Sequence, residues 1–206
     1  GIMNANRIRI ATPAFPPRTR IEGPEMTFSL NEAKVNKAVI YSGHSSFSVS
    51  GNINGIKNAL SRGGKLRARI LIDADTLNFN ELANAIAQGE EYMSTNNSFR
   101  DTLMKVSSED SLEEIIAMEG GDTISRMALV IVPQNIEAQI DLDVHYGVYS
   151  SIILHSAKGK LNSNNRCLQI LDFNANTSAG AMELNAFYKS KSKEELSVGF
   201  DLQFKN

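Results

Sequence analysis

The sequence predicts a β-rich α+β protein: an antiparallel β-sandwich or jelly-roll-like body that carries a helical insertion. Three observations lead to this prediction. Much of the chain alternates apolar and polar residues, residues 78–121 switch to helical spacing, and the polar turns between the expected strands are short. Short connections favour antiparallel hairpins, because a parallel pair needs a crossover of about a dozen residues or more. An open α+β sheet covered by the helices is the alternative architecture.

Residues 1–25 are expected to form a basic, proline-containing arm, ahead of a single β-rich domain over residues 26–206. Pro13, Pro16 and Pro17 fall within five positions, and no acidic residue occurs before Glu22. Proline fixes its own φ and has no N–H to donate to a strand ladder. The arm is therefore predicted to be extended or disordered.

Strand-like patterns follow at residues 26–30 and 37–50, and then a short helix that ends at Gly63-Gly64. The Gly51–Gly55 segment precedes this helix but lacks the spacing of a nucleotide-binding glycine loop, so it is interpreted as a structural turn. Residues 65–72 alternate cleanly, which predicts a half-buried strand with a basic outer face.

Helical spacing over residues 78–119 places apolar residues in three stripes, and Gly120-Gly121 ends the last helix. These helices are rich in acidic residues. We expect their acidic side to form a face for a protein partner, made of Glu90, Glu91, Glu109, Asp110, Glu113 and Glu114.

Beyond residue 126 the period returns to two. A buried strand is expected at 127–133, an alternating strand at 136–146 and an apolar one at 151–154. Further strands follow at 166–173, 181–188 and 195–205, separated by polar turns at 158–165, 174–180 and 190–194. In the last strand Leu196, Val198, Phe200, Leu202 and Phe204 are predicted to face the core.

Charge is sorted along the chain. Residues 1–72 carry 11 Lys or Arg against 3 Asp or Glu, whereas residues 73–143 carry 3 against 15. Sorting of this kind steers association, so it favours self-association or a protein partner, with single-stranded nucleic acid as the alternative partner for the basic part. The candidate nucleic-acid or phosphate-binding residues are Arg7, Arg9, Arg18, Arg20, Lys57, Arg62, Lys65, Arg67 and Arg69.

Asp141, Asp143 and His145 are the candidate metal ligands, because residues at i and i+2 on a strand share a face. One strand spaces such residues too widely for all three to converge, so a solvated strand face is favoured. The chain contains no catalytic signature. A hydrolase that uses these residues together with Asp73 or Asp75 is the enzymatic alternative.

The chain has a single cysteine, no run of 18 apolar residues and no signal-peptide pattern, so a reducing, intracellular location without a membrane span is expected. No cofactor is predicted. We expect a non-enzymatic assembly or binding protein that resembles, in architecture alone, the virus-type structural or nucleic-acid-associated β proteins with basic N-terminal arms. A host-interaction or immunity module that binds one protein partner is a further alternative.

Overall fold

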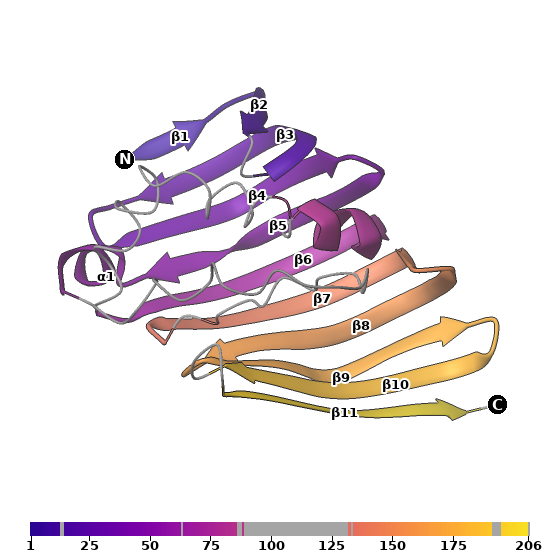
Figure 1. Ribbon diagram of the computed structural model, residues 1–206. Helices are drawn as coiled ribbons and strands as arrows, with labels where there is room; N and C mark the ends of the chain where they lie inside the picture. The colour runs from indigo at the N-terminus through magenta and orange to yellow at the C-terminus, as the bar shows by residue number, and fades with distance from the viewer. Residues whose placement is uncertain are drawn as a thin grey trace, which may run out of the picture.

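The computed structural model describes residues 1–12, 15–62, 64–85, 88, 132, 134–190 and 195–205. In these residues, 11 strands form one open sheet in the order β1-β3-β4-β5-β6-β7-β8-β9-β10-β11, with β2 also paired to β3 (Figure 1). The strands are β1 (Ile2–Asn4), β2 (Arg7–Thr12), β3 (Phe15–Phe28), β4 (Glu32–Ser42), β5 (Ser45–Asn54), β6 (Leu66–Asn78), β7 (Ile136–Tyr149), β8 (Ile152–Asn164), β9 (Cys167–Thr177), β10 (Gly180–Ser190) and β11 (Leu196–Lys205).

The fold is β-rich and mostly antiparallel, as predicted. Among the described strands every pairing is antiparallel except that of β6 with β7, which run parallel. The expected second sheet is not found among the described residues, because nearly every strand pairs with its neighbour along the chain. This arrangement corresponds to the open sheet considered as the alternative, and not to a sandwich or jelly roll.

Residues 1–25, expected to form an extended arm, contain β1, β2 and most of β3. The prolines of β3 fit because they avoid the ladder with β4. That ladder starts at Thr19, after Pro16 and Pro17, and its register shifts between Glu22 and Glu25, where Pro24 lies. Proline is tolerated where no ladder hydrogen bond is needed from its nitrogen.

The structural turn expected over Gly51–Gly55 is wrong for residues 51–54. Strand β5 continues through Asn54, and helix α1 (Ile56–Arg62) follows after Gly55. Gly51 has φ 150°, and a Cβ there would collide with the Arg69 carbonyl and lie 2.9 Å from the Ile70 Cα atom. The glycine therefore permits the close approach of β5 to β6, rather than ending the strand.

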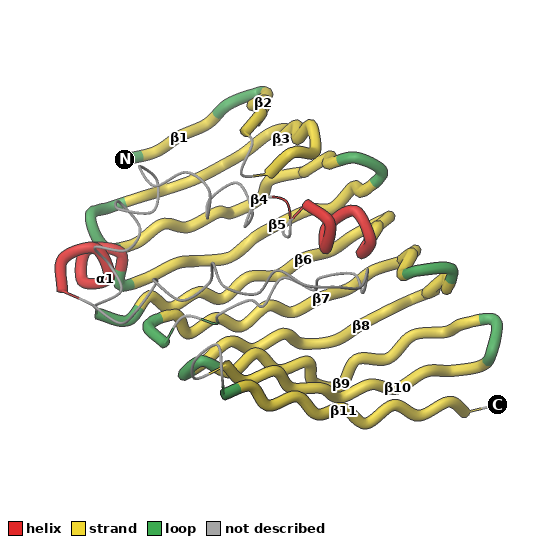
Figure 2. Tube along the Cα trace, viewed as in Figure 1, coloured by secondary structure: helices red, strands yellow, loops and turns green. Residues whose placement is uncertain are grey.

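A second helix covers residues 79–85, directly after β6, and lies against the sheet (Figure 2). The Asn78 side chain caps it, since Oδ1 accepts hydrogen bonds from the N–H groups of Asn80 and Glu81, both at 3.1 Å. This helix begins where the helical insertion was predicted to begin. Apart from residues 88 and 132, the rest of that insertion and the strand expected at 127–133 lie outside the described residues.

The buried core lies under this second helix. Phe79 and Leu82 pack onto a cluster in which Ala74, Val144 and Ala157 are fully buried. The remaining buried members of the cluster are Leu77, Leu154, Ala175 and Met182, from β6, β8, β9 and β10. The apolar residues that alternate along the central strands share this face, which we call the apolar face, and the opposite side is the polar face.

Two strands extend into the turns predicted to follow them. Strand β8 continues through Asn164, so most of the polar segment 158–165 is strand, and β9 continues to Thr177. The β8–β9 connection is two residues, Asn165 and Arg166, which have φ of 49° and 62°. Two consecutive positive φ values are typical of the tight hairpin turn that matches strand twist.

Candidate functional site

The polar face carries a row of long polar side chains that crosses six strands. Register pairs connect neighbouring members of this row from β4 to β9. The members are Lys34, Asn52, Arg69, Gln139, Asn162 and Gln169. Neighbouring members come from adjacent strands, about 4.8 Å apart, so their side chains can hydrogen-bond to one another or to a ligand laid across the strands.

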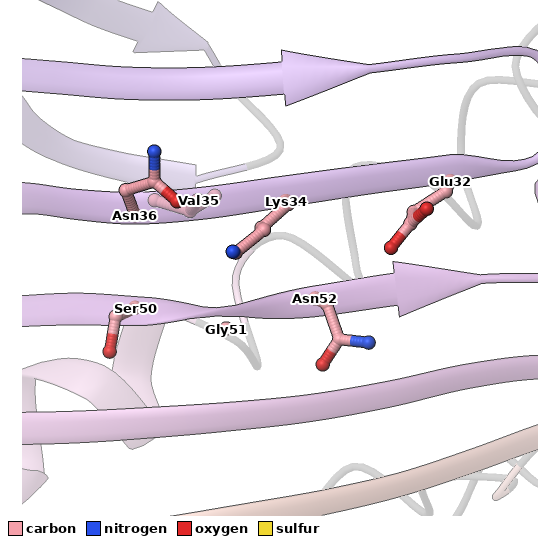
Figure 3. Close-up of a pocket in the computed structure, with 7 residues that line it drawn as sticks. All are labelled: Glu32, Lys34, Val35, Asn36, Ser50, Gly51 and Asn52. Atoms are coloured by element: carbon pink, nitrogen blue, oxygen red, sulfur yellow. The ribbon is translucent and has the colours of Figure 1, made fainter.

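Two shallow pockets lie along this row and share Asn52 as a lining residue. One, of about 540 Å³, is bordered by Glu32, Lys34 and Asn36 of β4 and by Ser50 and Asn52 of β5 (Figure 3). The other, of about 520 Å³, extends the depression over β5 to β9. Its polar lining residues are Asn52, Asn54, Arg67, Arg69, Glu137, Gln139, Asn162, Ser163, Asn164 and Gln169.

The basic residues near the N-terminus are partly engaged within the protein. Glu22 accepts ion pairs from Arg7 at 3.2 Å and from Arg20 at 3.1 Å. The Arg20 guanidinium also lies 4.4 Å from the centre of the Tyr41 ring. Arg9 and Arg18 are exposed.

A second basic group lies at the start of β6. Glu137 of β7 accepts an ion pair from Lys65 and another from Arg67, whose Nε is 2.9 Å from Oε2. The hydrogen bond from Lys65, followed by that from Arg67, lowers the pKa of Glu137. Arg69 donates to the Gln139 side chain at 3.3 Å. One acid thus offsets two of the bases that were predicted to contact phosphate.

The structure does not bring the two basic groups together. Arg20 is in register with Thr76 of β6 through Tyr41 and Ser46. Arg69 therefore lies three strands and seven residues away, roughly 14 Å across the sheet and 23 Å along it. Lys57 is exposed on α1, and Arg62 is the last residue of that helix.

Only some of the candidate carboxylates lie close together. Asp73 and Asp143 are register partners on the parallel strands β6 and β7, and Lys158 lies 2.7 Å from the Asp143 carboxylate. Asp141 accepts a hydrogen bond from Gln139 at 3.3 Å. No group of three or more His, Cys, Asp or Glu residues suited to a metal ion occurs among the described residues.

His145 lies where the alternation of β7 slips by one residue. Val144 and Gly147 are both buried, although a regular strand would bury residues an even number apart. His145 keeps the even spacing from Asp141 and Asp143 and is exposed, and the slip falls at the next residue, Tyr146, which is also exposed. Asp75 lies at the corresponding irregularity of β6, where the register with β5 shifts.

The acidic partner face predicted on the helices, Glu90, Glu91, Glu109, Asp110, Glu113 and Glu114, lies outside the described residues. No helix in the described part of the chain is both long and apolar enough to cross a membrane.

The apolar face continues to the end of the sheet, where it becomes exposed. The five apolar side chains of β11 are exposed by 40% to 75%, with Phe200 the most exposed. The prediction that these five side chains are buried in a core was therefore wrong, although the prediction that they share one face of the strand was correct. The reason is their position at the edge of the sheet, since in the described part of the chain β11 pairs with β10 alone.

Sequence reasoning missed both the polar row and the exposed strand. The alternation that would reveal the row is visible in the sequence, but the row depends on the parallel register of β6 with β7, which nothing local specifies. Comparisons of this chain with models of known protein families, with curated proteins and with solved structures found no match.

Proposed function

We propose that this chain is a non-enzymatic assembly or binding protein that works through the apolar face of its sheet and the open edge at β11. The observation that carries the proposal is the alternating apolar set on that edge strand, 40% to 75% exposed. Apolar patches that rim a sheet in this way are typical of interaction surfaces. The outer edge of β11, which has no partner strand among the described residues, also offers its backbone N–H and C=O groups to another chain.

The opposite edge is less suited to pairing. It is made of β1, with 3 residues, and β2, with 6 residues, both of which pair with β3. Short edge strands are a common protection against edge-to-edge pairing. The unbroken 10 residues of β11 have no such protection.

A charge placed on the exposed apolar set tests the proposal. We expect Phe200→Asp to remain folded and to abolish self-association, measured by size-exclusion chromatography with light scattering over a range of protein concentrations. Gln203→Asp is the matched control, because it adds the same charge on the other face of the same strand. A wild-type protein that is monomeric at every concentration and has no apolar ligand would contradict the proposal.

One observation favours a second candidate, the binding of a long apolar ligand such as an acyl chain. In β5, β6 and β7 the positions on the apolar face carry no charged residue and are mostly half-buried. They are Phe47, Val49, Gly51 and Ile53; Leu66, Ala68, Ile70 and Ile72; and Ile136, Ala138, Ile140 and Leu142. Ligand sites for apolar molecules are lined mainly by such side chains.

Titration of a fluorescent long-chain fatty acid separates the two candidates. Saturable binding by a monomer would support a ligand-binding role, and we expect Ile70→Asp, a change on the apolar face of β6, to weaken it. Leu71→Asp is the control, since Leu71 is 51% exposed on the polar face. Fatty-acid binding that is equally weakened by Leu71→Asp would argue against the apolar face as the site.

A further inference from the structure

The edge of β11 has the length and the side-chain order needed to pair with itself. Ten residues from Leu196 to Lys205 pair with β10 in unbroken antiparallel register, from Leu196 opposite Ser190 to Lys205 opposite Ala181. The strand is therefore regular along its whole length. Its other side has no partner strand among the described residues.

The face alternation restricts how a second β11 can pair antiparallel. In any register that keeps the two apolar faces continuous, residues of the same face must lie opposite one another. A one-residue slip would place Phe200 or Leu202 opposite polar-face residues. The allowed registers are therefore those in which the numbers of two paired residues add up to an even number. Successive allowed registers differ by two in this sum.

Two of these registers pair nine of the ten residues of β11, one with Phe200 at the two-fold axis and one with Asp201 there. The Phe200 register places Leu202 opposite Val198 and Phe204 opposite Leu196 of the second copy. On the polar face it places Gln203 opposite Ser197 and Lys205 opposite Glu195, so that opposite charges meet at both ends. Moving the axis to Asp201 would place two aspartates directly opposite each other, which is destabilising.

We infer that a second copy of this chain pairs antiparallel along β11, with Phe200 at the two-fold axis, to form one continuous sheet. Two-fold pairing of one surface with itself is the commonest arrangement of homo-oligomers. The pairing would extend the apolar face across both copies and give β11 a second neighbour. The inference rests on the proposed assembly function and specifies its partner and register.

Disulfide crosslinking of the full chain tests the register. In a Cys167→Ser background, Phe200→Cys places the two new thiols opposite each other across the axis, within the reach of a disulfide. We expect efficient oxidation to a covalent dimer on non-reducing gels. Leu202→Cys alone should not crosslink, but should form a mixed dimer with Val198→Cys.

The outcomes distinguish this inference from the function on which it rests. Efficient crosslinking of Leu202→Cys with itself, or a dimer by light scattering that Phe200→Cys does not crosslink, would overturn the register and leave assembly intact. A monomer at all concentrations would overturn both.

A charge reversal provides a second test that needs no cysteine. Lys205→Glu should raise the dimer dissociation constant about twofold to fivefold for each of the two symmetry-related pairs. Adding Glu195→Lys should restore it. Because Lys205 also pairs with Glu183 at 2.6 Å, Glu183→Gln is the control for loss of that internal contact. Failure of the double variant to recover would contradict the register.

Discussion

His44 and Glu81 join the β4–β5 turn to the helix that covers the core. One carboxylate oxygen of Glu81 accepts the backbone N–H of His44 at 2.8 Å, and the other contacts the His44 ring at Nδ1. The turn has Gly43 at its first position, with φ 57°, and a Cβ there would collide with the same carboxylate. The helix is thus held at its first turn both by its Asn78 cap and by a contact 37 residues away in sequence.

The contact between His44 and Glu81 is expected to depend on pH. The side-chain hydrogen bond and charge of Glu81 raise the pKa of His44 above its ordinary 6.5, and the hydrogen bonds from His44 lower the pKa of Glu81 below 4.5. The His44 contribution is therefore complete below pH 6.5 and is lost as pH rises through the raised pKa. The Glu81 contribution is complete above pH 4.5 and is lost as pH falls through the lowered pKa.

Stability should accordingly include the full contribution of this pair between pH 4.5 and 6.5. NMR titration of the His44 ring measures its pKa directly. In Glu81→Gln the side-chain oxygen can still accept the backbone N–H of His44, but it carries no charge. The pKa of His44 should therefore return toward its ordinary value in this variant. An unchanged pKa in the variant would show that Glu81 is not the cause.

Removing the charge of Glu137 should strengthen any binding of single-stranded nucleic acid. Glu137→Gln frees Lys65 and Arg67, and the salt dependence of affinity should become steeper by about 0.7 in log–log slope for each cation that reaches a phosphate. Fluorescence anisotropy with a labelled oligonucleotide at several salt concentrations measures this. Glu183→Gln is the control, since it frees Lys205 at the far edge of the sheet. If affinity and slope stay the same, Lys65 and Arg67 do not contact phosphate.

The exposed and buried apolar residues should differ sharply in their effect on stability. Leu154→Ala removes a side chain that is 4% exposed and should lower the free energy of unfolding by about 2–5 kcal/mol. Phe200→Ala alters a side chain that is 75% exposed and should change it by about 0.5 kcal/mol or less. Urea unfolding at a protein concentration below that of self-association compares the two. A large loss for Phe200→Ala in the monomer would place Phe200 in a core.

Gly51 should tolerate no side chain. Gly51→Ala forces a Cβ against the backbone of β6, and should cost about 1–3 kcal/mol in backbone strain alone, with a further cost because β5 and β6 must separate. Gly23→Ala is the control, because Gly23 has φ 55° but nothing within 4 Å of the added carbon. The Gly51 variant should therefore be the less stable of the two in thermal unfolding. Equal losses would mean that the close approach to β6 is relaxed at little cost.

The sequence predicted the strands well because alternation is a local property. Residues 65–72, 136–146 and 195–205 all lie largely in strands, with the alternation that was expected. The predictions that failed concern features that depend on distant parts of the chain. Whether Phe200 is buried is decided by whether another layer covers β11, and the polar row exists because Arg69 and Gln139 are register partners 70 residues apart.

The expectation that prolines exclude residues 1–25 from the sheet failed for a similar reason. Pro16, Pro17 and Pro24 exclude a strand only where its ladder needs their nitrogens, and the register of β3 with β4 avoids all three. Arg67 and Arg69, which were predicted to contact phosphate, line a pocket on the polar face, but the neutralising position of Glu137 was not foreseen.

The parallel pairing of β6 with β7 has a consequence for how the chain folds. The strands on either side of it form ribbons of antiparallel neighbours with mostly short connections, whose contacts are local and therefore fast to make. Joining β6 to β7 requires closure of the 57 residues from 79 to 135, which carries a larger entropic cost. The two ribbons should therefore form early and independently, and their union should be the slow, rate-limiting event of refolding.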